Sequence, residues 1–176
     1  MSKVIILTGP SGAGKSSVAK ELAENLTGVW ALISQDETRT FIKAGFKSPD
    51  EAWTDETKRQ WEVSITICCD MIKRYHEANI NCIIELFAPP TEFEKWKKQL
   101  GSIDYKLVVL LPSVEETVRR NANRKIPMKE HQIRENHEWF SQWKPSKAII
   151  IDTTTKSLAD TVKHIKQRVI GHADKT

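Results

Sequence analysis

Short runs of apolar residues recur along the chain, and a segment with helical spacing follows each of them. The runs are rich in Val, Ile and Leu and are nearly continuous, which is typical of strands buried on both faces of a parallel sheet. The five predicted strands span Val4–Leu7, Trp30–Ile33, Ile80–Leu86, Leu107–Leu111 and Ala148–Ile151. This alternation of strands and helices predicts an α/β fold, with a doubly wound five-stranded parallel sheet and helices on both of its faces.

The segments between the strands place apolar residues on one face of a helix. In the first segment, Val18, Leu22 and Leu26 share a face, and Gly28 can end the helix. The longest predicted helix has a stripe formed by Trp61, Ile65, Cys68, Ile72 and Tyr75. The last predicted helix has a stripe formed by Leu158, Thr161, Val162, Ile165 and Val169. Two short sequences, TEFE at 91–94 and SVEE at 113–116, predict capping boxes where two further helices begin.

The chain has 176 residues, which predicts a single domain, residues 1–176, with a sizeable core. It has no apolar run long enough to cross a bilayer and no segment of signal-peptide form, so we expect a cytoplasmic protein without a membrane partner. Its three cysteines, Cys68, Cys69 and Cys82, lack metal-binding spacing, which predicts reduced thiols that pack in the interior. The net charge of +4 suits anionic ligands but is too small to indicate nucleic-acid binding by itself.

The strongest chemical signal lies between the first strand and the first helix, in the sequence GPSGAGKS at 9–16. The spacing Gly-x-x-x-x-Gly-Lys-Ser is the P-loop pattern, in which backbone N–H groups surround phosphates at the N-terminus of a helix. Lys15 supplies a positive charge to the outer phosphates, and the Ser16 hydroxyl suits a magnesium ion. The residues expected to bind the nucleotide here are Gly9, Ser11, Gly12, Ala13, Gly14, Lys15, Ser16 and Ser17.

Two acidic residues stand at the ends of predicted strands, where ligands bind in this kind of fold. After the second strand, Asp36 can take a proton from an attacking hydroxyl, and Arg39, one helical turn on, can hold an oxyanion. A plain helix N-cap is the alternative role for Asp36. At the end of the third strand, Glu85 is a candidate for acceptor binding or for a water-mediated link to magnesium, with an exposed strand-end acid as the alternative.

A basic segment follows the fourth strand. Arg120 and Arg124 are four residues apart and lie on one face of the predicted helix. The segment after them, about 125–137, is polar, is interrupted by a proline and contains Arg134, as expected of a lid that closes over a transferring phosphate. A solvated basic helix face is the alternative.

Together these motifs resemble the small P-loop kinases, a group that includes the 5′-kinase domain of phage polynucleotide kinase, chloramphenicol phosphotransferase, the zeta toxins and gluconate kinase. The sequence GPSGAGKSS is similar to their nucleotide loop, SQDETR at 34–39 to the aspartate-x-x-arginine of the polynucleotide kinase, and VRRNANRK at 118–125 to its lid helix. The resemblance implies that Asp36 is the base, that Arg39 contacts the acceptor and that Arg124 is a catalytic arginine.

The end of the chain, IIIDTTTKSLADTVKHI at 149–165, is more similar to chloramphenicol phosphotransferase. In this family the loop after the fifth strand borders the adenine, which implies a place there for residues 154–156. Thr155 and Arg120 are accordingly expected to contact the nucleotide. Glu85 stands where several relatives carry aspartate, so the acceptor end of the site departs from the family pattern.

The sequence therefore predicts a kinase that uses ATP and Mg²⁺ to phosphorylate a hydroxyl group, with Lys15, Asp36, Arg39 and Arg124 as catalytic residues. A nucleotide-hydrolysing switch is less favoured, because the chain has neither an Asn-Lys-x-Asp run for guanine nor an Asp-x-x-Gly after the third strand. An ATPase module is a further, less favoured alternative.

We favour a small-molecule acceptor, a metabolite or an antibiotic, over the alternative of a nucleic-acid 5′-hydroxyl. Residues 40–62 hold four basic and five acidic side chains, which does not suit a groove for a nucleic-acid strand. The same segment contains Phe41, Phe46 and Trp53, which suit a partly apolar pocket. The remaining tryptophans fall mostly at helix positions that core packing explains, and they indicate an aromatic acceptor pocket only weakly.

Overall fold

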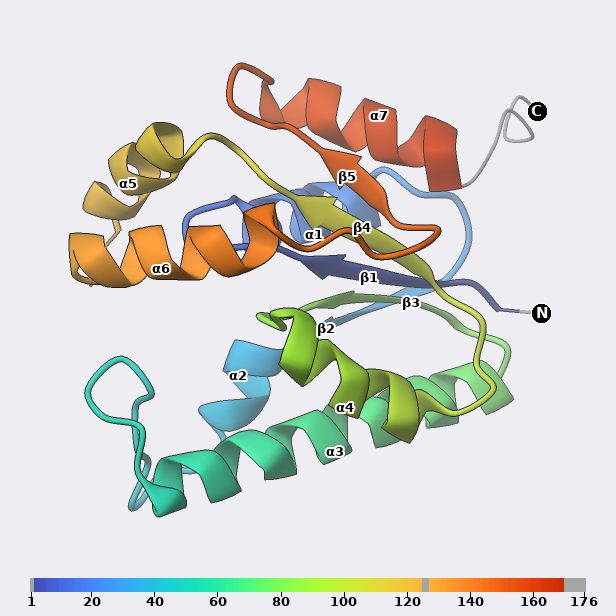
Figure 1. Ribbon diagram of the computed structural model, residues 1–176. Coiled ribbons are helices and arrows are strands. Elements are labelled where there is room, and N and C mark those ends of the chain that lie inside the picture. The colour runs from blue at the N-terminus through green and yellow to red at the C-terminus, as the bar shows by residue number, and fades with distance from the viewer. Residues whose placement is uncertain (1, 125–126, 170–176) are drawn as a thin grey trace.

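A five-stranded parallel sheet forms the centre of the protein in the computed structural model, which describes residues 2–124 and 127–169 (Figure 1). The strands are β1 (Val4–Thr8), β2 (Trp30–Ser34), β3 (Asn81–Glu85), β4 (Lys106–Leu110) and β5 (Ile149–Ile151). Their order across the sheet is β2-β3-β1-β4-β5, and every neighbouring pair is parallel. The predicted doubly wound sheet is therefore confirmed, with no strand end shifted by more than one residue.

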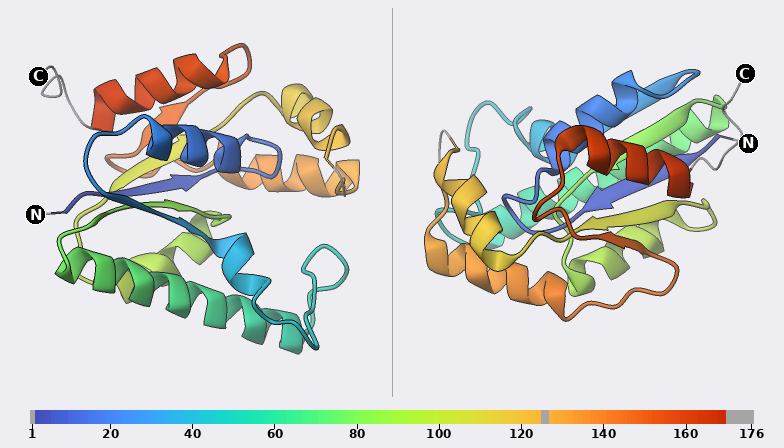
Figure 2. Two further views of the ribbon diagram at one scale, coloured as in Figure 1. Left: turned by 180° about the vertical axis from the view of Figure 1, so that it is seen from behind. Right: turned by 90° about the horizontal axis from the view of Figure 1, so that it is seen from above.

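Seven helices in the described part of the chain connect and cover the strands. They are α1 (Lys15–Glu24), α2 (Gln35–Arg39), α3 (Asp55–Glu77), α4 (Pro90–Leu100), α5 (Val114–Ala122), α6 (Glu130–Ser141) and α7 (Leu158–Val169). Helices α1 and α7 lie side by side over one face of the sheet, and α3 and α4 cover the other (Figure 2). No helix in residues 2–124 and 127–169 is both long enough and apolar enough to cross a membrane.

Strand residues alternate between two apolar cores, because successive side chains point to opposite faces of a sheet. On β1, Ile6 packs in the core under α3 and α4, whereas Ile5 and Leu7 pack in the core under α1 and α7. The larger core includes Trp96 and Phe140, both fully buried. Burying side chains of this size contributes about 1.5–3 kcal/mol each, so the sheet and its helices form a rigid base for the loops at its edge.

The helix starts were predicted less accurately than the strands. Ser113 does cap α5, since its Oγ accepts from the backbone N–H of Glu116 at 3.2 Å. The Glu116 carboxylate, however, binds Arg119 and Arg120 instead of completing the capping box. Thr91 is not a cap, because α4 already begins at Pro90, a residue whose fixed φ favours the first helical position.

Candidate functional site

The loop between β1 and α1 takes a shape that only glycine permits at two of its positions. Gly9 has φ 148°, and a Cβ on it would lie 2.2 Å from the carbonyl oxygen of Leu110. Gly14 adopts a left-handed conformation with φ 92° directly before α1 begins. The loop therefore curls tightly and leads into a helix N-terminus, whose unpaired N–H groups suit an anion.

Lys15 is held across this loop. Its Nζ donates to the carbonyl oxygens of Gly9 at 2.9 Å and Pro10 at 3.0 Å. Desolvation by burial lowers the pKa of Lys15, and the nearby carboxylates of Glu85 and Asp36 act in the opposite direction. A phosphate beside Nζ would compensate for the lost water, so the ammonium is prepared for an anionic ligand.

Glu85 faces the P-loop and is 6% exposed, which excludes the alternative of a solvated strand-end acid. Strand pairing aligns it with Leu7 on one side and with Ser34 on the other. Its Oε2 accepts from the Ser16 hydroxyl at 3.1 Å, and its Oε1 accepts from the Ser34 hydroxyl at 2.5 Å. The carboxylate thus connects the P-loop serine to the start of α2.

The pair formed by Ser16 and Glu85 fits a magnesium ion, because both offer the hard oxygen ligands that Mg²⁺ prefers. Within residues 2–124 and 127–169, no cluster of three or more His, Cys, Asp or Glu side chains is arranged to hold a metal. This donor set suits an ion bound chiefly by phosphates and water, with one or two protein oxygens, as is usual for Mg²⁺ with nucleotides.

Asp36 lies on α2 but does not cap it. Ser34 is the N-cap, with its Oγ accepting from the Glu37 backbone N–H at 3.3 Å. The Asp36 side chain is 69% exposed and accepts one bond, from Arg39 Nη1 at 3.3 Å. The N-cap alternative is therefore wrong for Asp36, and its carboxylate is available to a ligand.

A cavity of about 1260 Å³ brings these residues together. Of the residues predicted to form the site, those that line it are Ser11, Gly12, Gly14, Lys15, Ser16, Ser17, Asp36, Arg39, Glu85, Arg120 and Arg124. Gly9 and Ala13 lie behind the loop surface, and the buried Ala13 contributes its carbonyl to Arg120 instead. Thr155 is exposed and outside the cavity, so the structure does not bring it to the other predicted residues.

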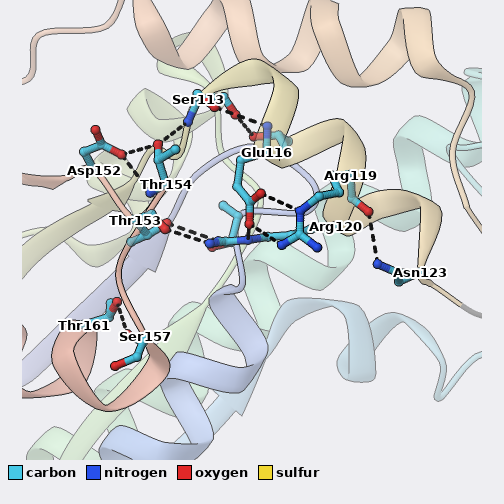
Figure 3. A network of polar contacts seen from close by, with 12 residues as sticks. Ser113, Glu116, Arg119, Arg120, Asn123, Asp152, Thr153, Thr154, Ser157 and Thr161 are labelled. Atoms are coloured by element: carbon cyan, nitrogen blue, oxygen red, sulfur yellow. Dashed lines mark hydrogen bonds and ion pairs between the residues drawn. The ribbon is translucent and has the colours of Figure 1, made fainter.

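Arg120 joins three segments into one unit (Figure 3). Its Nε donates to Glu116 on the same helix at 2.6 Å, and its Nη2 donates to the carbonyl oxygen of Thr153 at 2.7 Å. A longer bond of 3.4 Å reaches the carbonyl oxygen of Ala13 in the P-loop. The arginine therefore fixes the loop after β5 against both α5 and the P-loop.

That loop is itself held by Thr154, the neighbour of the predicted Thr155 (Figure 3). Thr154 Oγ1 accepts from the Ser113 backbone N–H at 2.7 Å and bonds to the Asp152 carboxylate at 2.5 Å. Hydrogen bonds from Thr154 lower the pKa of Asp152. In the part of the loop expected near the adenine, Thr154 thus has a structural role.

Arg124 differs from Arg120 in its setting. Helix α5 ends at Ala122, so the two arginines do not share a helix face, contrary to the prediction from their spacing. The Arg124 side chain is exposed, lines the cavity and makes no hydrogen bond or ion pair within the described residues. Its charge also acts on Lys15, lowering the pKa of that ammonium. Among the described residues, Arg124 is thus a cation without a side-chain partner at the cavity that the P-loop lines.

The segment predicted to form a lid, about 125–137, divides into parts. Residues 125–126 lie outside the described residues, and residues from 130 onward form the start of α6. The fully buried Ile133 anchors this helix, and Arg134 pairs with Glu130 at 2.8 Å away from the cavity. Asn121 holds the far end of the connection, bonding both the N–H and the carbonyl of Met128. A closing movement of this segment stays a prediction.

Sequence reasoning missed most of the aromatic lining of the cavity. Trp61, Phe87, Trp139 and Trp143 all contribute to it, although core packing had been the preferred explanation for the tryptophans. Trp96 and Trp61 are both buried members of the core, as core packing predicts, although Trp61 also lines the cavity. The sequence did contain one signal, its six tryptophans in 176 residues. Each indole N–H needs a hydrogen-bond partner when it is buried, so a core alone does not readily accommodate so many tryptophans.

Comparison with known proteins agrees with the fold described above. The AAA_33 family, described as an AAA domain, matches residues 4–143. No curated protein showed significant sequence similarity to the chain. Solved structures are similar along nearly the whole chain: a sugar kinase from Janibacter sp. HTCC2649 has a TM-score of 0.71 at 16% identity, with 98% of this chain and 96% of that one covered.

Two further structures are similar to a comparable degree. The tunicamycin resistance protein of Deinococcus radiodurans has a TM-score of 0.71 at 17% identity and covers 96% of both chains. Shikimate kinase from Acinetobacter baumannii, solved with shikimate, has a TM-score of 0.67 at 19% identity, covering 99% of this chain and 97% of that one. The fold is that of the small P-loop kinases. The chain belongs to the AAA_33 family.

Proposed function

We propose that the protein is an ATP-dependent kinase that transfers the γ-phosphate of ATP to a hydroxyl group of a small-molecule acceptor, a metabolite or an antibiotic. The observation that carries this proposal is one cavity lined by both the P-loop lysine and the exposed carboxylate of Asp36. A phosphate-binding loop facing an exposed carboxylate that can act as general base is what phosphoryl transfer to an alcohol requires.

In the proposed reaction the acceptor hydroxyl attacks the γ-phosphorus while its proton passes to Asp36. The bond from phosphorus to the β–γ bridging oxygen breaks, which leaves ADP and a phosphate ester. Lys15 and Arg124 stabilise the negative charge on the transferring group. Ser16 and Glu85 would hold magnesium, which neutralises charge between the β- and γ-phosphates when it is bound.

Arg120 is proposed to act on nucleotide binding through the loops that it joins. Its bonds to Ala13 and Thr153 keep the P-loop and the segment after β5 in a fixed relation. This arrangement supports a place for the adenine between these segments. Thr155 lies outside the cavity. We therefore propose that the loop containing Thr155 borders the adenine, without a contact from the Thr155 side chain.

The walls of the cavity support a small-molecule acceptor over a nucleic-acid strand. Phe46, Trp53, Trp61 and Phe87 all line the cavity that contains Asp36. Aromatic walls with a few polar groups are typical of small-ligand sites, whereas a strand-binding groove needs a row of basic side chains. The similar sugar kinase and shikimate kinase structures bear names of enzymes that act on small molecules.

The test is ADP formation from ATP and Mg²⁺ with a panel of acceptors: sugars, sugar acids, hydroxylated ring compounds, antibiotics and a 5′-hydroxyl oligonucleotide at low and raised salt. We expect ADP to form at a rate that depends on one class of small alcohol, and Lys15→Ala to abolish it without loss of fold. Equal ADP formation without any acceptor would indicate a switch or ATPase. Labelling of the oligonucleotide that falls steeply with salt would indicate a polynucleotide kinase.

A further inference from the structure

Arg39 is the central residue of an aromatic stack at the acceptor end of the cavity. Its side chain is 7% exposed, and its guanidinium carbon lies 5.3 Å from the centre of the Phe46 ring and 4.9 Å from that of Trp61. The guanidinium thus makes cation–π contacts with both rings, an arrangement that favours arginine over lysine because the planar guanidinium stacks on aromatic faces.

The hydrogen-bonding edge of this guanidinium is almost unused. A guanidinium has five N–H donors, and the described residues accept from one of them, through the 3.3 Å bond to Asp36. That bond is longer than the 2.7–2.9 Å typical of charge-assisted pairs, by about 0.4 Å or more. Since Arg39 lines the cavity, its edge can bind a planar anion beside Asp36.

Gln60 fixes the position of Phe46 in the stack. Its side chain is buried on α3, where Nε2 donates to the carbonyl oxygen of Gly45 at 2.8 Å and Oε1 accepts from the backbone N–H of Lys47 at 2.9 Å. These bonds hold the chain on both sides of Phe46. A buried and fully satisfied amide of this kind specifies one loop conformation, so the stack is built and not accidental.

The charges around the stack favour an anion with a single charge. Within the described residues, Asp36 is the carboxylate that pairs with Arg39, at 3.3 Å, whereas Asp50, Glu92, Glu135 and the basic Lys144 line the cavity elsewhere. Lys15 and Arg124 lie at the P-loop, where the nucleotide phosphates are proposed to bind. A phosphate dianion at Arg39 would be repelled more strongly by the adjacent Asp36 carboxylate than a singly charged carboxylate, which also matches the planar fork.

We propose that the acceptor is a hydroxy acid with a flat, largely apolar body, and that the edge of the Phe46–Arg39–Trp61 stack binds its carboxylate. The proposal rests on the proposed kinase function, since Asp36 then orients the hydroxyl on the same molecule. The Asp36 Oδ1 and Arg39 Nη1 atoms are 3.3 Å apart, so the carboxylate and the reacting hydroxyl are close neighbours on the acceptor.

The experiment uses a panel of flat hydroxylated ring compounds, each as carboxylic acid, primary amide and phosphate monoester. Binding to the full-length protein without nucleotide is measured by calorimetry and by tryptophan fluorescence. We expect the best acids to bind on the order of 10–100-fold tighter than their amides, as a charge-assisted hydrogen bond would provide. We also expect the acids to bind tighter than the matching phosphate monoesters.

Variants separate the stack from the general charge of the cavity. Arg39→Met should abolish the preference for acid over amide, and Arg39→Lys should restore only part of it, because lysine lacks the planar fork. Gln60→Ala should weaken acid binding while ADP binding is unchanged. Arg59→Met is the matched control: Arg59 is the neighbour of Gln60 on α3, also bonds to Glu56, but is 71% exposed and outside the cavity, so acid binding should not change.

Three results would overturn the proposal: amides that bind as tightly as acids throughout the panel, phosphate monoesters that bind tighter than acids, or an acid preference that survives in Arg39→Met. Failure of the kinase function is distinguishable from these. Acids that bind through Arg39 but are never phosphorylated would refute the kinase reaction and leave the subsite intact. Phosphorylation of a neutral alcohol, with no preference for acids over amides, would refute the carboxylate subsite and leave the kinase reaction intact.

Discussion

Asp36 does not cap α2, so its chemistry can be tested without removing a helix cap. Ser34 caps α2, and the Asp36 carboxylate is 69% exposed with a single long bond to Arg39. We expect Asp36→Asn to lower turnover by about 10²–10⁴-fold, the range of a general base, with nucleotide affinity and melting temperature unchanged. Steady-state kinetics, nucleotide titration and thermal unfolding measure the three quantities. A variant that turns over normally would remove Asp36 from the mechanism.

Ser34 supports both a helix start and the Glu85 carboxylate, and a second variant can separate these roles. Ser34→Ala removes an N-cap, which lowers stability by about 0.5–2 kcal/mol, and also frees Glu85 Oε1. We therefore expect weaker Mn²⁺ binding to the nucleotide complex, measured by electron paramagnetic resonance. Ser113→Ala is the matched control, because Ser113 caps α5 by a similar bond but does not contact Glu85. Equal Mn²⁺ affinity in both variants would exclude the positioning role of Ser34.

Single residues also mark the limit of what the sequence predicts. The P-loop could be recognised from the sequence because its glycines and lysine form a fixed local pattern. The strand ends also bring Asp36 and Glu85 to one cavity, as expected. The choice between a cap and a base for Asp36 depended on which neighbour accepts one N–H, which spacing alone does not decide. The bonds that Gly45 and Lys47 make to Gln60 on α3, which hold Phe46 at the cavity, have no local signature in the sequence.

At the scale of elements, the end of α5 separates two arginines that the sequence treats alike. Arg120 lies within the helix and is bonded to Glu116 and Thr153, whereas Arg124 follows the helix end and is unpaired in the described part of the chain. Strands were predictable because a buried parallel strand is apolar throughout. The helix end was not, because its marker is Asn123, a weaker C-terminal signal than glycine, and no proline follows directly.

Alanine variants of the two arginines should therefore differ. Arg124→Ala should lower kcat by on the order of 10³–10⁵-fold, the range of arginine fingers, with little change in the KM for ATP. Arg120→Ala should weaken nucleotide binding and lower the melting temperature, because it breaks the connection among the P-loop, α5 and the loop after β5. Kinetics and calorimetry on both variants check this. The reverse pattern would mean that Arg120 is the transition-state cation.

At the scale of the whole molecule, the sheet order explains why residues distant in sequence meet in one cavity. The neighbours β2, β3 and β1 end side by side, so α2, Glu85 and the P-loop start from the same edge. The two cores beneath them are closed by α3 and α4 on one face and by α1 and α7 on the other. Stability of the fold and geometry of the site are thereby linked through the same strands.

The three cysteine thiols can be used to measure how tightly this core is closed, because all of them are fully buried between the sheet and α3. Burial raises the pKa of Cys68 and Cys82 to about 11 and that of Cys69 to about 12. A raised folded-state pKa stabilises the fold below the ordinary thiol pKa, and this contribution is lost as the pH rises. We therefore expect the free energy of unfolding, measured with urea, to fall between about pH 9 and pH 11, where unfolded thiols ionise and folded ones do not. At pH 8 a disulfide reagent should label all three thiols together and only at the rate of global unfolding. Rapid labelling of the native protein would show that α3 opens independently of the sheet.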